Sequence, residues 1–233
     1  MKLINTSNSP ASDAGNFINN CLSKSKKTEV LLLLSGGSSL KVLEYINVNL
    51  LDKNLTCMMG DERFTTGSGN NFLQLRKTKF YKKAKQNNIV FINTSVKTGE
   101  THKKYITRLN KELENYLQEH PEAYLIGLFG VGYDGHTAGI FPKQTKSEFE
   151  KIYHSDNYFI GINEPDNEFH KRVTLTPSFI HESIAEVILF AAGKQETLMT
   201  LSFTERVHQF PALLLTKHKH CSLFTDAEIP AFI

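Results

Sequence analysis

Residues 30–39 of the chain are VLLLLSGGSS, an unbroken apolar run followed by two glycines and three serines. Consecutive apolar residues over this length predict a strand buried on both faces, as in a parallel sheet covered by helices. The glycines permit positive φ angles and close approach of the backbone to a ligand, and Ser38 or Ser39 can cap a following helix. Backbone amides at a helix start favour a phosphate. The segment is therefore a candidate anion-binding loop, and an ordinary strand–helix turn is the alternative.

The same pattern of short apolar runs and longer helical stretches continues along the chain. The clearest helix is predicted at residues 99–119, where Tyr105, Leu109 and Leu113 share one face at four-residue spacing. Strands that alternate with helices indicate an α/β fold, with a mostly parallel β-sheet covered by helices on both faces. We expect one domain over residues 1–233. The predicted strands are 30–34, 55–59, 89–92, 124–129, 158–162, 186–191 and 222–224, and the other predicted helices are 12–23, 39–48, 71–83, 177–183 and 194–203.

Composition and charge argue against several classes of protein. The 233 residues are 40% hydrophobic and 22% charged, and 27 Lys and Arg against 24 Asp and Glu give a net charge of only +3. With no basic stripe among aromatic residues, this charge gives no indication of a nucleic-acid partner. Cys21, Cys57 and Cys221 are too far apart for a Cys-x-x-Cys metal site. No apolar run reaches the ~18 residues of a membrane span, and MKLINTSNSP lacks a signal-peptide core, so we expect a cytoplasmic protein with no membrane partner.

Charged residues follow the second predicted strand directly. Residues 60–63 are Gly-Asp-Glu-Arg, so Asp61, Glu62 and Arg63 lie at the end of a strand. In parallel sheets, ligands bind where loops leave the carboxyl ends of the strands. These charges can face such a crevice, and a solvated surface position is the alternative.

The most informative segment is residues 128–142, LFGVGYDGHTAGIFP. A predicted strand runs into a glycine-rich loop that holds the carboxylate of Asp134 and the imidazole of His136. Glycines let the backbone crowd a ligand, and histidine, with an ordinary pKa of ~6.5, suits proton transfer near neutral pH. A structural histidine is more often found within a regular element, so we expect a functional role for His136.

Two further cations lie beside apolar runs. Arg172 precedes Val-Thr-Leu-Thr-Pro, and Lys194 follows Ala-Ala-Gly. Either can clamp a phosphate, arginine through its planar fork and lysine as a point charge, and a surface position is the alternative for each. His218 and His220 are flanked by lysines in a polar turn, and we expect no metal site there or elsewhere in the chain.

The segments SGGSS, GDER, GVGYDGHTAGIFP, RVTLTP, AGK and PALLL…FTDAE resemble, in this order, the motifs of the glucosamine-6-phosphate isomerase/6-phosphogluconolactonase family. The resemblance spans nearly the whole chain and implies a Rossmann-like fold of the NagB/RpiA/CoA-transferase-like type. It also implies hydrolysis of 6-phospho-D-glucono-1,5-lactone to 6-phospho-D-gluconate, the second step of the oxidative pentose phosphate pathway, with no cofactor or metal. The implied partner is a small phosphorylated sugar lactone, bound by a monomer or weak homo-oligomer.

The motif match implies a role for each candidate site residue. His136 would be the general base that activates water and then protonates the departing ring oxygen. Arg63 would stabilise or position the developing negative charge, with Asp61 nearby, and Asp134 would shape the loop or orient the site. The residues implied to hold the 6-phosphate are Ser35, Gly36, Gly37, Ser38, Arg172 and Lys194.

Two other functions compete with this one. Glucosamine-6-phosphate deaminase shares the fold, but its pattern has a tyrosine where this chain has Arg63 and a glutamate where it has Phe141. A reaction that opens a ring and moves a proton between carbons needs that carboxylate. A non-catalytic sugar-phosphate-binding protein is the second alternative, because related folds serve as effector-binding domains of regulators. The chain also departs from the family in having Leu40 in place of a proline and a shorter segment at 64–70.

Overall fold

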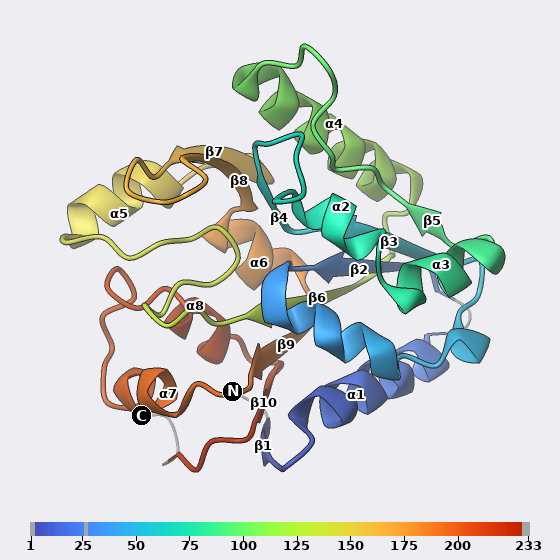
Figure 1. The fold of residues 1–233 in the computed structure, drawn as a ribbon, viewed down its shortest axis with the longest axis horizontal. Coiled ribbons are helices and arrows are strands. Elements are labelled where there is room, and N and C mark those ends of the chain that lie inside the picture. The colour runs from blue at the N-terminus through green and yellow to red at the C-terminus, as the bar shows by residue number, and fades with distance from the viewer. Residues whose placement is uncertain (1–2, 26–27, 230–233) are drawn as a thin grey trace.

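The computed structural model describes residues 3–25 and 28–229 of the chain. Its central feature is a parallel sheet in the order β1-β10-β9-β6-β2-β3-β5 (Figure 1). Every pairing in this sheet is parallel, so the prediction of a mostly parallel sheet is confirmed. Its strands are β1 (Leu3–Thr6), β2 (Val30–Leu34), β3 (Leu55–Met59), β5 (Val90–Phe91), β6 (Tyr124–Gly130), β9 (Glu186–Ala191) and β10 (Cys221–Thr225).

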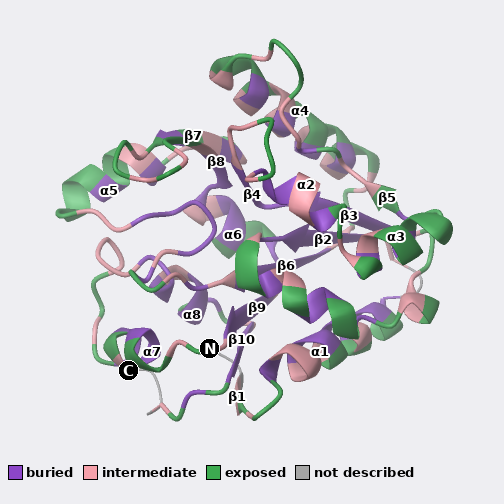
Figure 2. Ribbon diagram, in the orientation of Figure 1, coloured by how far each residue is buried: buried purple, intermediate pink, exposed green. Residues whose placement is uncertain are grey.

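The apolar run of β2 explains why helices cover both faces of the sheet. Its side chains alternate between two core clusters, so that Leu31 and Leu33 pack on one side and Leu32 and Leu34 on the other. Figure 2 shows the buried residues along the sheet and the inner faces of the helices. The helices that complete the first cluster are α4 (His102–Glu119), α5 (Lys146–Tyr153), α6 (Pro177–Ser183), α7 (Gln195–Ser202) and α8 (Leu213–Thr216). Those that complete the second are α1 (Pro10–Lys24), the 3₁₀ helix η1 (Gly37–Tyr45), α2 (Asn71–Leu75) and α3 (Lys79–Gln86).

Three strands form a second, antiparallel sheet in the order β4-β8-β7. They are β4 (Asp61–Arg63), β8 (Lys171–Leu175) and β7 (Phe159–Asn163). The strand predicted at residues 158–162 exists as β7, but it belongs to this small sheet and not to the parallel one. The sequence gives little signal for β4 and β8, because β4 is short and charged and β8 begins with two cations.

Two predicted helices take a different form. The helix expected at residues 71–83 is divided into α2 and α3, because the Thr78 hydroxyl accepts a hydrogen bond from the Tyr81 amide and starts a new helix. The helix expected at residues 39–48 is the 3₁₀ helix η1, which is followed by a short 3₁₀ turn, η2 (Val48–Leu50). Ser39 does not cap η1 by accepting from an amide. Its hydroxyl donates to the carbonyls of Ser35 and Gly36 instead.

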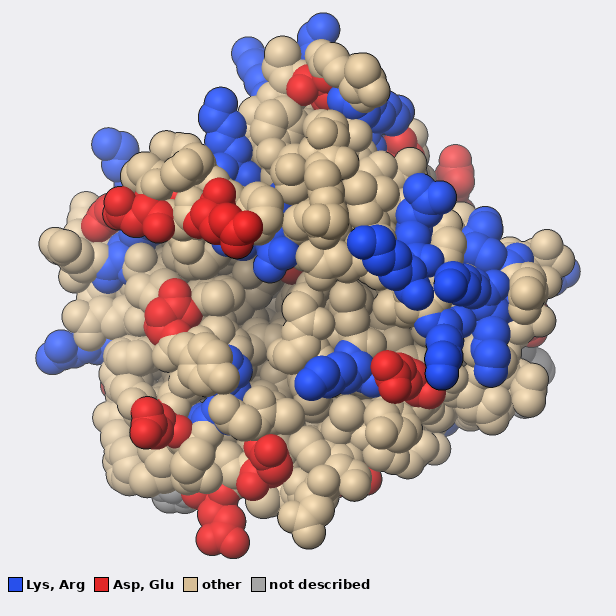
Figure 3. Space-filling model, viewed as in Figure 1, with Lys and Arg blue, Asp and Glu red and all other residues tan. Residues whose placement is uncertain are grey.

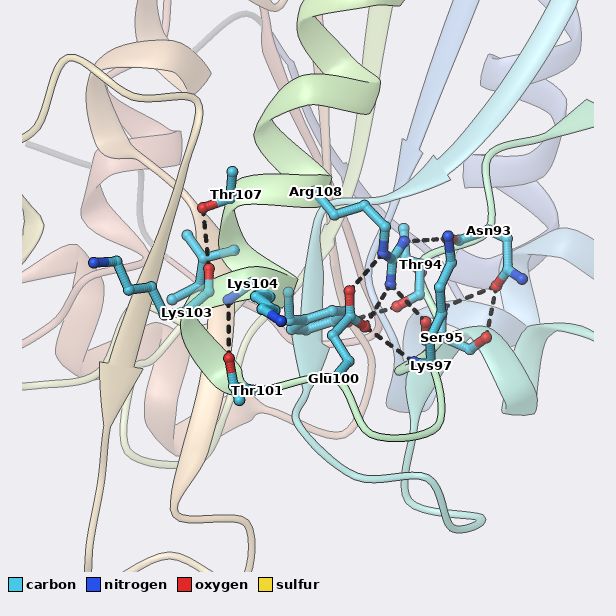
Figure 4. Close-up of polar contacts among 12 residues, drawn as sticks. Asn93, Thr94, Ser95, Lys97, Glu100, Thr101, Lys103, Lys104, Thr107 and Arg108 are labelled. Carbon is cyan, nitrogen blue, oxygen red and sulfur yellow. Dashed lines mark hydrogen bonds and ion pairs between the residues drawn. The ribbon is translucent and has the colours of Figure 1, made fainter.

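The start of α4 is tied to the segment after β5 (Figure 4). The guanidinium of Arg108 binds the Glu100 carboxylate, with an Nε–Oε1 distance of 2.8 Å, and donates to the carbonyls of Asn93 and Ser95. The hydroxyl of Tyr105 donates to the carbonyl of Thr94. These bonds fix the segment 93–95 against α4. The segment matters for the site because the Thr94 hydroxyl donates a hydrogen bond to Glu62 on β4.

Among the described residues, none of the helices has the length and apolar composition of a membrane span.

Candidate active site

A polar pocket lies where the loops leave the carboxyl ends of β2 and β6. These strands are adjacent in the sheet, whereas the chain continues from β2 to β3 on the other side, so the pocket lies at the point where the strand order reverses. The face drawn in Figure 3 is hollowed near its centre, where η1 begins in Figure 1. Most of the candidate residues line this pocket, namely Ser35, Gly36, Gly37, Ser38, Asp61, Arg63, His136 and Arg172. Asp134 and Lys194 are not among its lining residues.

Hydrogen bonds from the side chain of Ser39 hold the loop after β2 in place. The hydroxyl of this buried residue lies 2.9 Å from the carbonyl oxygen of Ser35 and 2.8 Å from that of Gly36. Gly37 has a φ of +67°, which a residue with a side chain rarely adopts. The loop thus turns sharply and presents Gly36, Gly37 and Ser38 to the pocket. This is the arrangement that an anion-binding loop requires.

The loop after β6 pairs Asp134 with His136. Asp134 Oδ1 lies 2.5 Å from His136 Nδ1 and also accepts a hydrogen bond from the His136 backbone amide, at 3.1 Å. A carboxylate can only accept, so Nδ1 carries the proton and Nε2 is left as the basic nitrogen. A Cβ on Gly132 would overlap the imidazole, so only glycine at this position lets the ring fold back over the loop. Asp134 therefore acts on the site through His136, although it does not line the pocket itself.

Both members of this pair are partly exposed, at 33% of the His136 side chain and 51% of the Asp134 side chain. Partial burial by itself raises the pKa of Asp134, but the hydrogen bonds and the charge of His136 outweigh this effect and leave the pKa below its ordinary value. Asp134 is therefore ionised at neutral pH. An ionised partner favours a proton on Nδ1 and stabilises the imidazolium that forms when Nε2 accepts a second proton.

Side chains along β4 point alternately to opposite sides of the strand, so the charged residues of Gly-Asp-Glu-Arg lie either in the pocket or in the protein interior. Asp61 and Arg63 line the pocket, whereas Glu62 points away and is 1% exposed. The Asp61 side chain is itself buried at 6% exposure. Burial raises the pKa of Asp61, opposed by the nearby Ser35 hydroxyl and by the charges of Arg63 and Arg172. The Ser35 hydroxyl lies near this carboxylate without meeting hydrogen-bond geometry.

The two arginines lie side by side in the small sheet. Arg63 on β4 is paired with Arg172 on the neighbouring strand β8, and both contact Phe169. The Arg63 guanidinium lies 5.2 Å from the Phe169 ring centroid, and Arg172 Nε donates to the Phe169 carbonyl. Arg172 also lies 4.8 Å from the ring centroid of Phe141. Burial lowers the pKa of Arg172, as does the charge of Arg63, so an anion bound between them would relieve their repulsion.

Lys194 contacts the loop after β6 and does not line the pocket. Its Nζ atom lies 2.9 Å from the ring centroid of Tyr133. Burial lowers the pKa of Lys194, partly offset by the nearby negative charge of Asp134. The hydroxyl of Thr197 also donates to the Tyr133 carbonyl, so α7 is docked on this loop. The assignment of Lys194 as a phosphate ligand remains a prediction, and it requires the side chain to leave the Tyr133 ring.

Asn71 is a further residue of the pocket, and no motif in the sequence indicates it. Residues 70 and 71 are both asparagine, and only a helix cap would be expected there. Asn70 makes that cap by accepting from the Leu73 amide, whereas Asn71 lines the pocket beside Asp61. The sequence feature that could have indicated Asn71 is its position at the start of a helix that follows the charged end of a strand. No group of three or more His, Cys, Asp or Glu residues in the described part of the chain could hold a metal ion.

The fold and the pocket together define an α/β enzyme that acts on a small anionic substrate. Residues 5–224 match the family described as glucosamine-6-phosphate isomerases/6-phosphogluconolactonase. The chain belongs to this family, as the motifs of its sequence indicate. A comparison with curated proteins gives no significant match.

Solved structures share this fold over almost the full chain. A 6-phosphogluconolactonase from Shewanella baltica OS155 has a TM-score of 0.77 at 18% identity, covering 99% of this chain and 98% of its own. That of Trypanosoma brucei has a TM-score of 0.71 at 20% identity, covering 97% and 96%. A monomeric glucosamine-6-phosphate deaminase has a TM-score of 0.66 at 18% identity, covering 97% of each chain. At these identities the likeness establishes the fold, and the choice between the two activities depends on the site.

Proposed function

We propose that the chain hydrolyses 6-phospho-D-glucono-1,5-lactone to 6-phospho-D-gluconate. The observation that carries this proposal is the Asp134–His136 pair beside a pocket lined by Arg63, Arg172 and the glycine loop. The pair supplies one base, the arginines supply positive charge, and the loop supplies backbone amides. Lactone hydrolysis needs a base for water, a cation or donor for the oxygen that gains charge, and a proton for the leaving oxygen.

The steps balance with one histidine. His136 Nε2 accepts a proton from water as the water oxygen bonds to the lactone carbonyl carbon, and the carbonyl oxygen becomes negatively charged. Arg63 stabilises this oxyanion. When the tetrahedral intermediate collapses, the bond from carbon to the ring oxygen breaks, and the imidazolium returns its proton to that oxygen. Asp134 keeps the ring in the productive tautomer and stabilises the imidazolium in between.

The phosphate is proposed to bind at the glycine loop and Arg172, with Lys194 completing the site. Gly36, Gly37 and Ser38 offer backbone amides, and Ser35 closes the base of the loop. An ionised Asp61 would repel a phosphate, so the dianion is proposed to bind toward Arg172 and Ser38 and away from the Asp61 carboxyl group.

Phe141 favours the lactonase over the deaminase. Its ring lies 4.8 Å from the His136 imidazole, centroid to centroid, at the position where the deaminase pattern has a glutamate. A phenyl ring cannot carry a proton, and Arg63 stands where that pattern has a tyrosine. A ring-opening isomerisation followed by amine release therefore lacks its acid–base groups at these positions. A non-catalytic binding protein would have no need of the Asp134–His136 pair.

The test is a lactonase assay with freshly generated 6-phosphogluconolactone, measured against its spontaneous hydrolysis. We expect turnover well above background and no ammonia from glucosamine 6-phosphate. Ammonia release at several turnovers per second, with no lactone hydrolysis above background, would identify the deaminase instead. Binding of 6-phosphogluconate without turnover of either substrate would identify a sugar-phosphate sensor.

A further inference from the structure

Asn71 is a buried residue of the pocket wall that the proposed mechanism leaves without a role. It is 1% exposed, and its Nδ2 lies 3.0 Å from both the carbonyl oxygen and the carboxylate Oδ2 of Asp61. Both of these partners can only accept when Asp61 is ionised, so the amide nitrogen must face Asp61. The amide oxygen consequently points the other way.

The backbone of Asn71 is bound to Glu62, the residue that follows Asp61 on β4. Glu62 Oε2 accepts from the Asn71 amide at 2.8 Å, and Glu62 Oε1 accepts from the Phe72 amide at 2.7 Å. Glu62 Oε1 also accepts from the hydroxyl of Thr94, at 2.9 Å, in the segment that Arg108 fixes to α4 (Figure 4). The first turn of α2 is thus bound to β4 through the buried carboxyl group of Glu62, which holds the backbone of Asn71 beside Asp61.

The glycine loop lies against the other side of the Asn71 amide. A Cβ on Gly36 would overlap the Asn71 side chain, and Asn71 Oδ1 is the first atom that it would meet. Asn71 Oδ1 has no hydrogen-bond partner among the residues that the structure describes. One side chain therefore spans from the carboxylate of Asp61 to the anion-binding loop.

This contact fixes the orientation of the Asp61 carboxyl group. Asp61 Oδ2 is bound by Asn71, whereas Oδ1 is buried and has no hydrogen-bond partner in the described part of the chain. The groups that face this carboxylate are Ser35 from the end of β2, Arg63 on its own strand, Arg172 from β8 and His136 from the loop after β6, and Glu62 is the neighbouring acidic residue on β4. A carboxyl group on the wall of the pocket can accept a hydrogen bond from a hydroxyl of the sugar, whereas the phosphate offers it no donor.

We propose that Asn71 is a positioning residue of the active site, which binds one oxygen of Asp61 and so holds this carboxyl group at the pocket wall, where it accepts a hydrogen bond from a sugar hydroxyl of the substrate. This inference rests on the proposed function. It predicts that loss of Asn71 weakens recognition of the sugar and not of the phosphate. It also predicts that Asp61 becomes harder to ionise, because the amide donors favour its charged form.

The matched variants are Asn71→Ala and Asn70→Ala. Asn70 is equally buried and caps the same helix, but its side chain donates to the Arg63 carbonyl and accepts from the Leu73 amide, and it makes no hydrogen bond to Asp61 in the described part of the chain. We expect Asn71→Ala to lower kcat/KM by about 10- to 100-fold, the effect of losing a hydrogen bond to a charged group. The loss should be the same for 6-phosphogluconolactone and for phosphate-free gluconolactone. Asn70→Ala should lower the melting temperature and change kcat/KM by less than about threefold.

The second measurement does not depend on turnover. In carboxylate ¹³C NMR, the Asp61 signal is assigned by its loss in Asp61→Asn, and its titration should move to higher pH in Asn71→Ala but not in Asn70→Ala. An unchanged titration in Asn71→Ala, or equal activity losses in the two variants, would overturn the inference. If Asn71→Ala does not fold, Asn71→Ser provides the same comparison. If the wild type itself has no lactonase activity, the proposed function fails, and the NMR titration alone decides whether Asn71 controls Asp61.

Discussion

Replacing Asp134 tests how much of the chemistry depends on the orientation of His136. Asp134→Asn keeps an oxygen that can accept from Nδ1 but removes the charge, whereas Asp134→Ala removes both. A hydrogen bond to a charged group contributes ~1.5–3 kcal/mol, which corresponds to roughly 10- to 150-fold in rate. Because half of the Asp134 side chain is exposed, water screens the pair, and the lower part of this range applies. We expect kcat to fall about tenfold for Asp134→Asn and about 30-fold for Asp134→Ala.

The assay follows acid release from freshly generated 6-phosphogluconolactone between pH 6.5 and 8, with the spontaneous rate subtracted at each pH. Asp52→Asn is the control, because Asp52 is an exposed aspartate near the amino end of β3, far from the pocket. KM should change little in either Asp134 variant, since this carboxylate does not line the pocket. A folded Asp134→Ala enzyme with wild-type kcat would refute the assignment of Nε2 as the base held by Asp134.

The remaining predictions concern three other parts of the site. His136→Ala should lower kcat by about 10²- to 10⁴-fold, the usual effect of losing a positioned proton-transfer group, and full activity in a folded variant would contradict its role. Arg172→Ala and Lys194→Ala should each raise KM for the phosphorylated lactone about 10- to 100-fold, and an equal effect on phosphate-free gluconolactone would show that they do not bind the phosphate. Burial raises the pKa of Glu62 to about 8, so the native state holds this proton more tightly than the unfolded chain and loses stability as the pH rises from about 5 through 8. Melting temperatures between pH 5 and 9 should therefore fall more steeply for the wild type than for Glu62→Gln, and parallel curves would disprove the raised pKa.

Much of the fold could be predicted because it depends on local patterns. Continuous apolar runs marked β2, β3, β6 and β9, since a parallel strand covered on both faces can contain almost no polar side chain. The small sheet could not be predicted in the same way. The residues of β4 and β8 include three cations and two carboxylates, and their strand conformation depends on pairing with each other. That pairing is a tertiary contact which no local pattern records.

The candidate site followed from the rule that ligands bind at strand ends, and most of the candidate residues do line one pocket. What the sequence could not reveal is which side chain reaches which neighbour. Lys194 follows a strand end as expected, yet it rests on the ring of Tyr133. The sequence suggests only a helix-capping role for the pair of asparagines at 70 and 71. The close approach of Gly36 and Asp61 to Asn71 is what distinguishes it from Asn70.

The pairing of Arg63 with Arg172 limits how the lengths of related chains can vary. Their alignment depends on the β4–β8 register, and adding or removing one residue inside either strand would turn a guanidinium to the opposite side of the sheet. The connecting segments at 64–70 and 164–170 are less restricted away from Gly69 and Phe169, which contact the arginines, because they can lengthen without rotating either strand. Insertions and deletions among natural variants should therefore collect in those two segments and be missing from the strands between them. Grafting this pocket onto another protein would likewise require both strands, since the position of each arginine depends on the pairing of β4 with β8.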